Sequence, residues 1–166
     1  SSATTMIGIF KDTGYTAMET LNLGSQFSTV KVTDMTEMFN NAGYTAMKGL
    51  DVSKFNTAIV TNMNNMFNGT GHDSMTSLTL GSNFSTAGVT NMSGMFANTE
   101  KIQSLDVSKF NTSSVQNMSY MFANTKALTT LNLSNFNTAN VTKMQYMFQN
   151  AEKLTSLNLG SSFNTA

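Results

Sequence analysis

All twelve phenylalanines of this 166-residue chain recur at two positions of one repeating pattern. The first position holds Phe10, Phe39, Phe67, Phe96, Phe122 and Phe148, and the second holds Phe27, Phe55, Phe84, Phe110, Phe136 and Phe163. The fourteen methionines keep the same register, and most of them lie one or four residues before a phenylalanine of the first position. So complete a pattern predicts stacked repeats whose Phe and Met side chains form a shared core.

The repeat divides the chain into six units, which together form a single domain over residues 1–166. The predicted units are residues 3–31, 32–59, 60–88, 89–114, 115–140 and 141–166. The period is 26 residues in the last three units and 28 or 29 in the first three, and the extra residues lie around Gly14, Gly43 and Gly71. Insertions confined to one point of a repeat indicate a loop on one face of the stack.

Each unit contains two candidate elements. Residues 115–122 carry apolar side chains at spacings of three and four, which predicts one face of a short helix. Asn124 is then expected in the left-handed conformation that often ends a helix. Residues 128–133 alternate apolar and polar side chains around Leu131 and Leu133, as in a half-buried strand. The predicted fold class is an α/β repeat, a leucine-rich-repeat-like solenoid of six units, each with a short helix plus a short strand in a parallel sheet.

Composition argues against several classes of function. Nine lysines balance nine acidic residues, there is no arginine, and no basic cluster is present. Nucleic acid is therefore not an expected partner, because its phosphates are neutralised by a basic surface. The chain has no cysteine, and no apolar run approaches the ~20 residues of a membrane span. We expect neither a disulfide, nor a thiolate metal site, nor membrane insertion.

The sequence shows no constellation of residues typical of catalysis. His72 is the only histidine and is expected to be an exposed loop residue. Asp51 and Asp106 fall two units apart, too far to share one calcium ion, and we expect Lys54 and Lys109 to pair with them on the surface. The chain is therefore not expected to be an enzyme, and we predict no catalytic, cofactor-binding or metal-binding residue.

The best candidates for partner binding are the outward-facing positions of the predicted strands and the four tyrosines. The strand positions form two polar columns that would also serve simply to keep the sheet soluble. We expect Tyr120 and Tyr146 to stack in adjacent units, whereas Tyr15 and Tyr44 line the loop insertion. The column residues are Thr20, Ser77, Ser104, Thr130 and Ser156 in one column, and Asn22, Thr79, Asp106, Asn132 and Asn158 in the other.

Three segments together resemble the repeat of BspA-type leucine-rich-repeat surface proteins of bacteria. They are Asn-Phe-Asn-Thr at 135–138, Asn-Val-Thr-Lys-Met-Gln-Tyr-Met-Phe at 140–148 and Leu-Thr-Ser-Leu-Asn-Leu at 154–159. The chain departs from the usual leucine-rich repeat where a buried Asn or Cys normally follows the strand. There it has the second phenylalanine position, and we infer that a stacked Phe ladder replaces an Asn ladder.

The resemblance implies an exported protein anchored at the cell surface and engaged in adhesion. We therefore expect a non-enzymatic module that binds a host or microbial surface glycoprotein, glycan or matrix protein. The alternative is a structural stalk that displays another domain away from the cell wall. The chain lacks an export signal and an anchor, so we expect it to be part of a longer protein, and we expect its apolar ends to promote end-to-end self-association.

Overall fold

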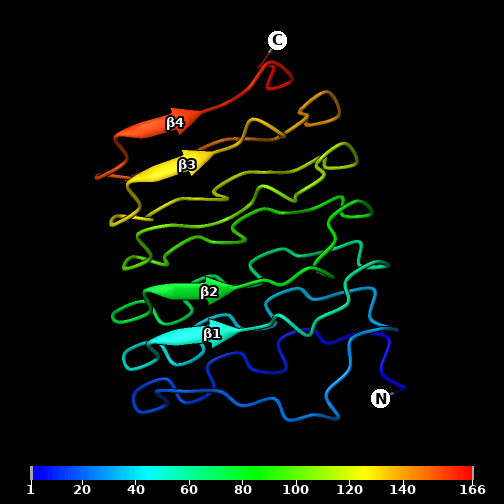
Figure 1. Cartoon of the computed structure of the whole chain (residues 1–166), viewed down its shortest axis with the longest axis vertical. Coiled ribbons are helices and arrows are strands. Elements are labelled where there is room, and N and C mark those ends of the chain that lie inside the picture. Colours follow the sequence, from blue (N-terminus) through cyan, green and yellow to red (C-terminus); the bar gives the residue numbers. More distant parts are fainter. Residues whose placement is uncertain (1, 166) are drawn as a thin grey trace.

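The computed structural model describes residues 2–165, which contain four short strands and no helix. The strands β1 and β2 pair in parallel with Leu50 opposite Leu78, and β3 and β4 pair in parallel with Leu131 opposite Leu157 (Figure 1). Their bounds are Gly49–Asp51 for β1, Ser77–Thr79 for β2, Thr130–Asn132 for β3 and Ser156–Asn158 for β4. The predicted α/β leucine-rich-repeat solenoid, with a helix plus a strand in every unit, is therefore wrong.

Consecutive turns replace the predicted helices. Tyr120, in the middle of the predicted helix, has φ of 60°, and Asn124 has φ of 57°. Every unit has a left-handed residue at each of these two positions, four residues apart. The first position comprises Gly8, Glu37, Asn65, Gly94, Tyr120 and Tyr146, and the second Asp12, Asn41, Gly69, Asn98, Asn124 and Asn150. A right-handed helix cannot include a left-handed residue at every fourth position. The left-handed conformation predicted for Asn124 is confirmed, although Asn124 ends no helix.

Backbone hydrogen bonds in these segments alternate between two kinds. The amides of Met35, Glu37 and Phe39 donate to carbonyls of the next unit at 2.8–3.0 Å. The intervening amides of Met38 and Asn40 donate to the carbonyl three residues earlier, at 3.2 and 3.0 Å. The backbone donors are thus paired without a helix, and these segments of neighbouring units are joined along their length. We call the segments 5–13, 34–42, 62–70, 91–98, 117–124 and 143–150 the turn segments.

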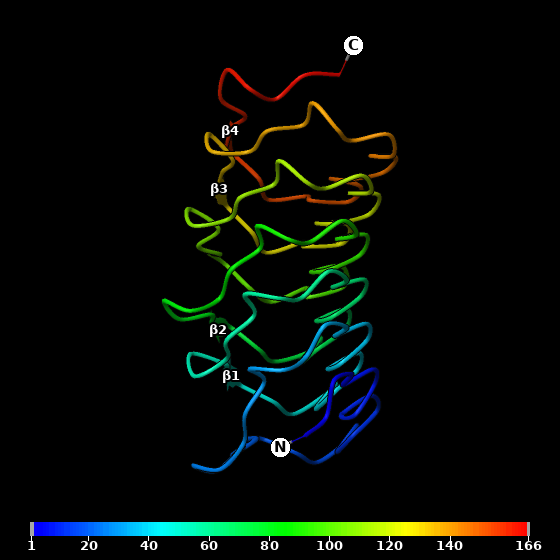
Figure 2. The ribbon, with the colours of Figure 1, turned by 90° about the vertical axis from the view of Figure 1, so that its right-hand side faces the viewer.

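The molecule has two long faces, as two perpendicular views show. The strands lie along one side of the stack, and the turn segments lie along the opposite side (Figures 1 and 2). Isolated parallel bridges extend the ladder of the turn segments from Thr5 through Asp34, Asn62, Asn91 and Asn117 to Lys143. We call the two sides the strand face and the turn face. Among the described residues no helix could span a membrane.

The core between the two faces is built from the Phe and Met residues, as the sequence predicts. Phe39, Phe67, Phe96 and Phe122 are fully buried, and their rings stack in nearly parallel pairs with centroids 5.6 to 5.7 Å apart. The second position forms a similar ladder, in which Phe110 lies 6.1 Å from Phe84 and 6.4 Å from Phe136. The predicted Phe ladder is thus confirmed.

A buried threonine two residues after the second phenylalanine joins each unit to the next. The Thr86 hydroxyl donates to the Asn111 carbonyl at 2.9 Å and accepts from the Asn111 amide at 2.8 Å. Thr112 makes the same pair of bonds with Asn137, at 2.9 and 2.8 Å. No buried side-chain nitrogen or oxygen lacks a hydrogen-bond partner within residues 2–165. The core therefore carries its polar atoms at little cost, because each is paired.

Candidate functional site

The strand face presents both predicted columns to solvent. All ten of their side chains are exposed, and the register places Thr130 beside Ser156 and Asn132 beside Asn158. Ser104 belongs to no strand but forms a parallel bridge with Thr130. The exposed residues are Thr20, Asn22, Ser77, Thr79, Ser104, Asp106, Thr130, Asn132, Ser156 and Asn158. The structure thus aligns hydroxyl and amide groups along one face, where a partner can reach them.

Most Asn and Asp side chains of this face also hold the turn that follows them. The Oδ1 atoms of Asn132 and Asn158 accept the amide two residues later, at 3.0 and 3.1 Å. Asn22 and Asp106 do the same at 2.9 Å each. This bond leaves their second polar atom toward solvent, so one residue both shapes the turn and offers a contact.

The predicted ion pairs of the strand face do not form. The ion pairs found among residues 2–165 include neither Asp51 with Lys54 nor Asp106 with Lys109. Hydrogen bonds from the side chain and the backbone of Ser53 lower the pKa of Asp51, and the charge of Lys54 adds only a smaller effect. The Asp51 carboxylate accepts a hydrogen bond from the Ser53 amide within its own turn, and Lys54 is exposed to solvent.

The four candidate tyrosines form two separate stacks. Tyr15 and Tyr44 lie with ring centroids 4.6 Å apart and an interplanar angle of 6°. Tyr120 and Tyr146 lie 5.0 Å apart at 26°, which confirms the predicted stacking across units. No ring contact joins the two pairs within the described chain, and the second pair belongs to the turn face. The tyrosines and the polar columns therefore do not form one continuous site.

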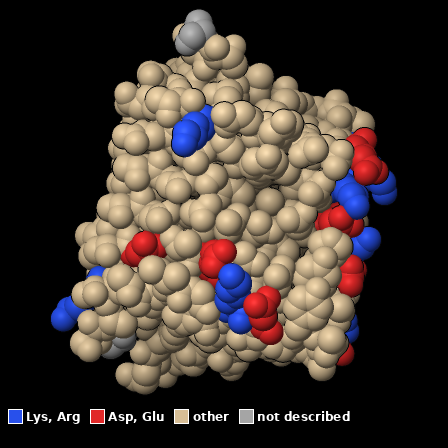
Figure 3. Space-filling model, turned by 180° about the vertical axis from the view of Figure 1, so that it is seen from behind, with Lys and Arg blue, Asp and Glu red and all other residues tan. Residues whose placement is uncertain are grey.

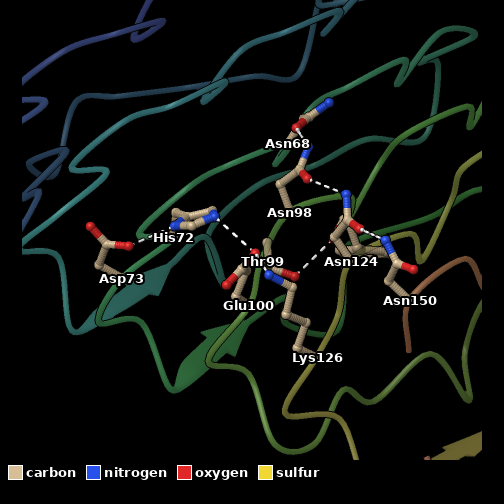
Figure 4. Close-up of polar contacts among 10 residues, drawn as sticks. Asn68, His72, Asp73, Asn98, Thr99, Glu100, Asn124, Lys126 and Asn150 are labelled. Carbon is tan, nitrogen blue, oxygen red and sulfur yellow. Dashed lines mark hydrogen bonds and ion pairs between the residues drawn. The ribbon is translucent and has the colours of Figure 1, made fainter. Parts of the chain in front are cut away.

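His72 extends the first stack and was wrongly predicted to be an exposed loop residue. Its ring lies 4.3 Å from that of Tyr44 at an angle of 7°, and its side chain is 17% exposed. Nδ1 contacts Asp73 Oδ1 at 2.7 Å and Nε2 contacts Glu100 Oε1 at 3.2 Å (Figure 4). Carboxylates thus occupy both ring nitrogens, and neither nitrogen is left to accept a proton from a nucleophile.

A short chain of charges continues this stack into the next units. Lys126 donates to Glu100 at 2.6 Å (Figure 4). Burial tends to raise the pKa of Glu100, but the hydrogen bond from Lys126 and the charge of His72 outweigh it, so the pKa is lowered. Burial raises the pKa of Tyr44, and the nearby Tyr15 adds to the effect. No group of three or more His, Asp and Glu residues in the described chain is arranged to hold a metal ion.

A ladder of asparagine amides runs along the turn face, and sequence reasoning missed it. Asn98 Nδ2 donates to Asn68 Oδ1 at 2.8 Å, Asn124 donates to Asn98 at 2.6 Å, and Asn150 donates to Asn124 at 2.8 Å (Figure 4). The recurrence of Asn two residues after the first phenylalanine in the last three units was its sequence signal. An Asn ladder therefore exists beside the Phe ladder, at a different position of the repeat.

The fold and its surface columns define a repeat protein whose units are joined through equivalent residues. The family model described as "Mycoplasma protein of unknown function, DUF285" matches residues 4–79 and again residues 71–166. Because these two matches cover almost the whole chain, the chain belongs to this family. No curated protein and no solved structure is significantly similar to it.

Proposed function

We propose that the chain is a non-enzymatic adhesion module that binds a host or microbial surface glycoprotein or matrix protein. It acts as part of a larger exported protein of the BspA type, anchored at the bacterial cell surface. The observation that carries the proposal is the pair of exposed polar columns on the strand face. The resemblance of residues 135–159 to the BspA-type repeat supports the location and the broad role.

The chemistry of the strand face suits recognition of a polar surface. Neighbouring strands lie about 4.8 Å apart, so their exposed side chains repeat at a short and regular interval. The strand face carries hydroxyls and amides and two carboxylates, those of Asp51 and Asp106. Hydroxyl and amide groups both donate and accept, and repeat proteins bind partners over such extended faces.

The geometry of the one histidine argues against an acid–base role. An enzyme that uses histidine as a base needs a free ring nitrogen within reach of a nucleophile. In this chain Asp73 and Glu100 engage both nitrogens of His72, and an aromatic ring covers its face. We assign this cluster to holding the loops of successive units together.

A binding assay with a matched control tests the strand face. The double variant Ser104→Lys/Thr130→Lys places two long charged side chains on bridged neighbours in the middle of one column. The control, Ala87→Lys/Ala139→Lys, adds the same charge at exposed positions outside both columns. We expect saturable binding of the purified chain to mucin or an extracellular matrix protein, weakened at least about tenfold in the first variant only. Equal binding by the two variants would show that the strand face is not the adhesive surface.

The continuous backbone bonding between turn segments favours a second function, a structural stalk. Amides such as those of Met63, Phe67 and Phe96 donate to the neighbouring unit, which makes the stack one connected body. A stalk needs length and stiffness and no specific surface. In the full-length parent protein, residues 89–140 can be replaced by an unrelated spacer of equal length. Retained cell adhesion would support the stalk, and lost adhesion would exclude it.

A further inference from the structure

The turn face contains a groove at Gly94 that the proposed function does not use. Gly94 occupies the left-handed position that Asn65 fills in the preceding unit and Tyr120 in the following one. A hollow of about 280 Å³ lies between these two residues, and the Oδ1 of Asn65 lies where a side chain at residue 94 would begin. The side chains around it include those of Asn65, Asn68, Asn98, Tyr120 and Asn124. Gly94, Ala97 and Ala123 are buried and form the floor.

We propose that this groove binds a neutral carbohydrate, one sugar ring of a surface glycan. The inference rests on the proposed adhesive function and names the class of its ligand, but it places that ligand on the face opposite the strands. The volume lies near the lower end of ligand pockets, about 300 Å³, which suits a single ring.

The first argument is the absence of charge around the groove. None of its lining residues is ionisable near neutral pH, and the back of the molecule shows a broad uncharged area between scattered charges (Figure 3). An anionic ligand would lose its hydration without gaining a cationic partner. A neutral ligand loses much less on binding, so the lining selects against acidic sugars and phosphates.

The second argument is the unused hydrogen-bonding capacity of the Asn ladder. A side-chain amide has two N–H donors and an oxygen with two lone pairs. Within the ladder, Asn98 uses one donor toward Asn68 and one lone pair toward Asn124, and Asn124 bonds likewise to its two neighbours. Each amide keeps one donor and one lone pair, and both residues line the groove. Sugar hydroxyls both donate and accept, and the ladder fixes the amides before the ligand arrives, which lowers the entropy lost on binding.

The third argument is the orientation of Tyr120. Its ring stacks on Tyr146 of the following unit, 5.0 Å away, and this contact covers one face. No other ring of the described residues stacks on Tyr120, and Tyr120 lines the groove. The apolar C–H face of a sugar ring can pack on this aromatic surface while its hydroxyls reach the amides. Tyr120 is 44% exposed, so a ligand has access to it.

Two variants alter the groove, and each introduces asparagine, a residue that already occurs at this left-handed position of the repeat. Gly94→Asn fills the hollow and Tyr120→Asn removes the aromatic surface. Both copy Asn65, which holds the same left-handed conformation with φ of 53°. A Cβ at residue 94 would overlap the Oδ1 of Asn65, so the Asn65 amide must turn away and give up the hydrogen bond that it accepts from Asn68. Ile59→Asn is the matched control, because it removes an exposed apolar side chain outside the groove.

The test is an NMR titration of the full chain with methyl glycosides of glucose, galactose, mannose and N-acetylglucosamine, and with sialic acid as the anionic probe. We expect at least one neutral glycoside to bind in the millimolar range and to shift the amide signals of Gly94, Asn98 and Asn124. Gly94→Asn and Tyr120→Asn should each weaken binding at least about tenfold. Ile59→Asn should leave it unchanged, and sialic acid should not bind.

The outcomes separate this inference from the proposed function. No neutral glycoside binding, or shifts confined to residues outside the groove, would overturn the inference, and both results come from the unaltered chain. Circular dichroism shows whether each variant is folded. If Ser104→Lys/Thr130→Lys loses mucin or matrix binding but keeps the glycoside, the two sites are independent. If the glycosides fail while adhesion still depends on the strand face, the proposed function stands without this groove.

Discussion

The left-handed residue in the middle of each turn segment gives a sharp test of the fold at Tyr120. In a helix, glycine is about 1 kcal/mol less favourable than alanine. At the φ of 60° observed for Tyr120, alanine is strained by about 1–2 kcal/mol. The greater entropy that glycine loses on folding offsets about 0.5–1 kcal/mol of this. Tyr120→Gly should therefore be more stable than Tyr120→Ala by about 0.5–1 kcal/mol, the reverse of the order in a helix.

Comparing two variants of one residue removes other effects. Both lose the stacking of Tyr120 on Tyr146, so that loss cancels in the difference. Urea unfolding followed by circular dichroism gives the two midpoints, and equal slopes show that the unfolded states are comparable. Gln103 is a matched control, because it is exposed and its φ is not positive. There Gln103→Ala should be at least as stable as Gln103→Gly. A Tyr120→Ala variant more stable than Tyr120→Gly would refute the turn structure.

Three further predictions concern the ladders and the charged cluster. Asn124→Gly keeps the left-handed backbone but removes two side-chain hydrogen bonds, so the free energy of unfolding measured in urea should fall by about 1–3 kcal/mol. Asn150→Gly removes only the bond to Asn124 and should have about half that effect. The pKa of Glu100 is lowered in the folded chain, so the stability that its carboxylate contributes is present above the unfolded pKa and is lost as the pH falls through the folded pKa. The free energy of unfolding should therefore begin to drop below about pH 4.3. The drop should be less steep in Glu100→Gln. Phe96→Ala should destabilise the chain by about 3–5 kcal/mol, because Phe96 is fully buried between stacked rings. Phe163→Ala should give a smaller loss, because Phe163 is only half-buried, and calorimetric scans of the two variants would show the difference.

The core could be predicted from the sequence because burial follows directly from the repeated Phe and Met positions. The helices could not, since two successive turns place apolar side chains at the same spacing as a helix does. In residues 115–122, Met121 donates its amide to Met118 three residues back, so Val115, Met118 and Met121 all point inward without a helical backbone. The sequence does contain the contrary signal. Glycine at residue 94, in the middle of a supposed helix, marks a position of positive φ.

The exposure of the column residues could be predicted from the sequence, whereas the surroundings of His72 could not. Column residues repeat within every unit, so the period alone aligns them. The partners of His72 come from units of different length, with Tyr44 in residues 32–59 and Glu100 in residues 89–114. Their contact depends on how the loop insertion is accommodated. The packing of these loops in three dimensions determines the contact, and the spacing of residues in the sequence does not predict it.

The joints between units rest largely on backbone amides and carbonyls, which every residue type except proline supplies in full. One unit can therefore follow another with little regard to the identity of its exposed residues. The junction between residues 60–88 and 89–114 already joins units of unequal length, and Phe67 still donates to Met95 at 3.0 Å across it. A gene that gains or loses whole units by recombination keeps compatible junctions, so the length of such a stack can change while its exposed residues diversify separately.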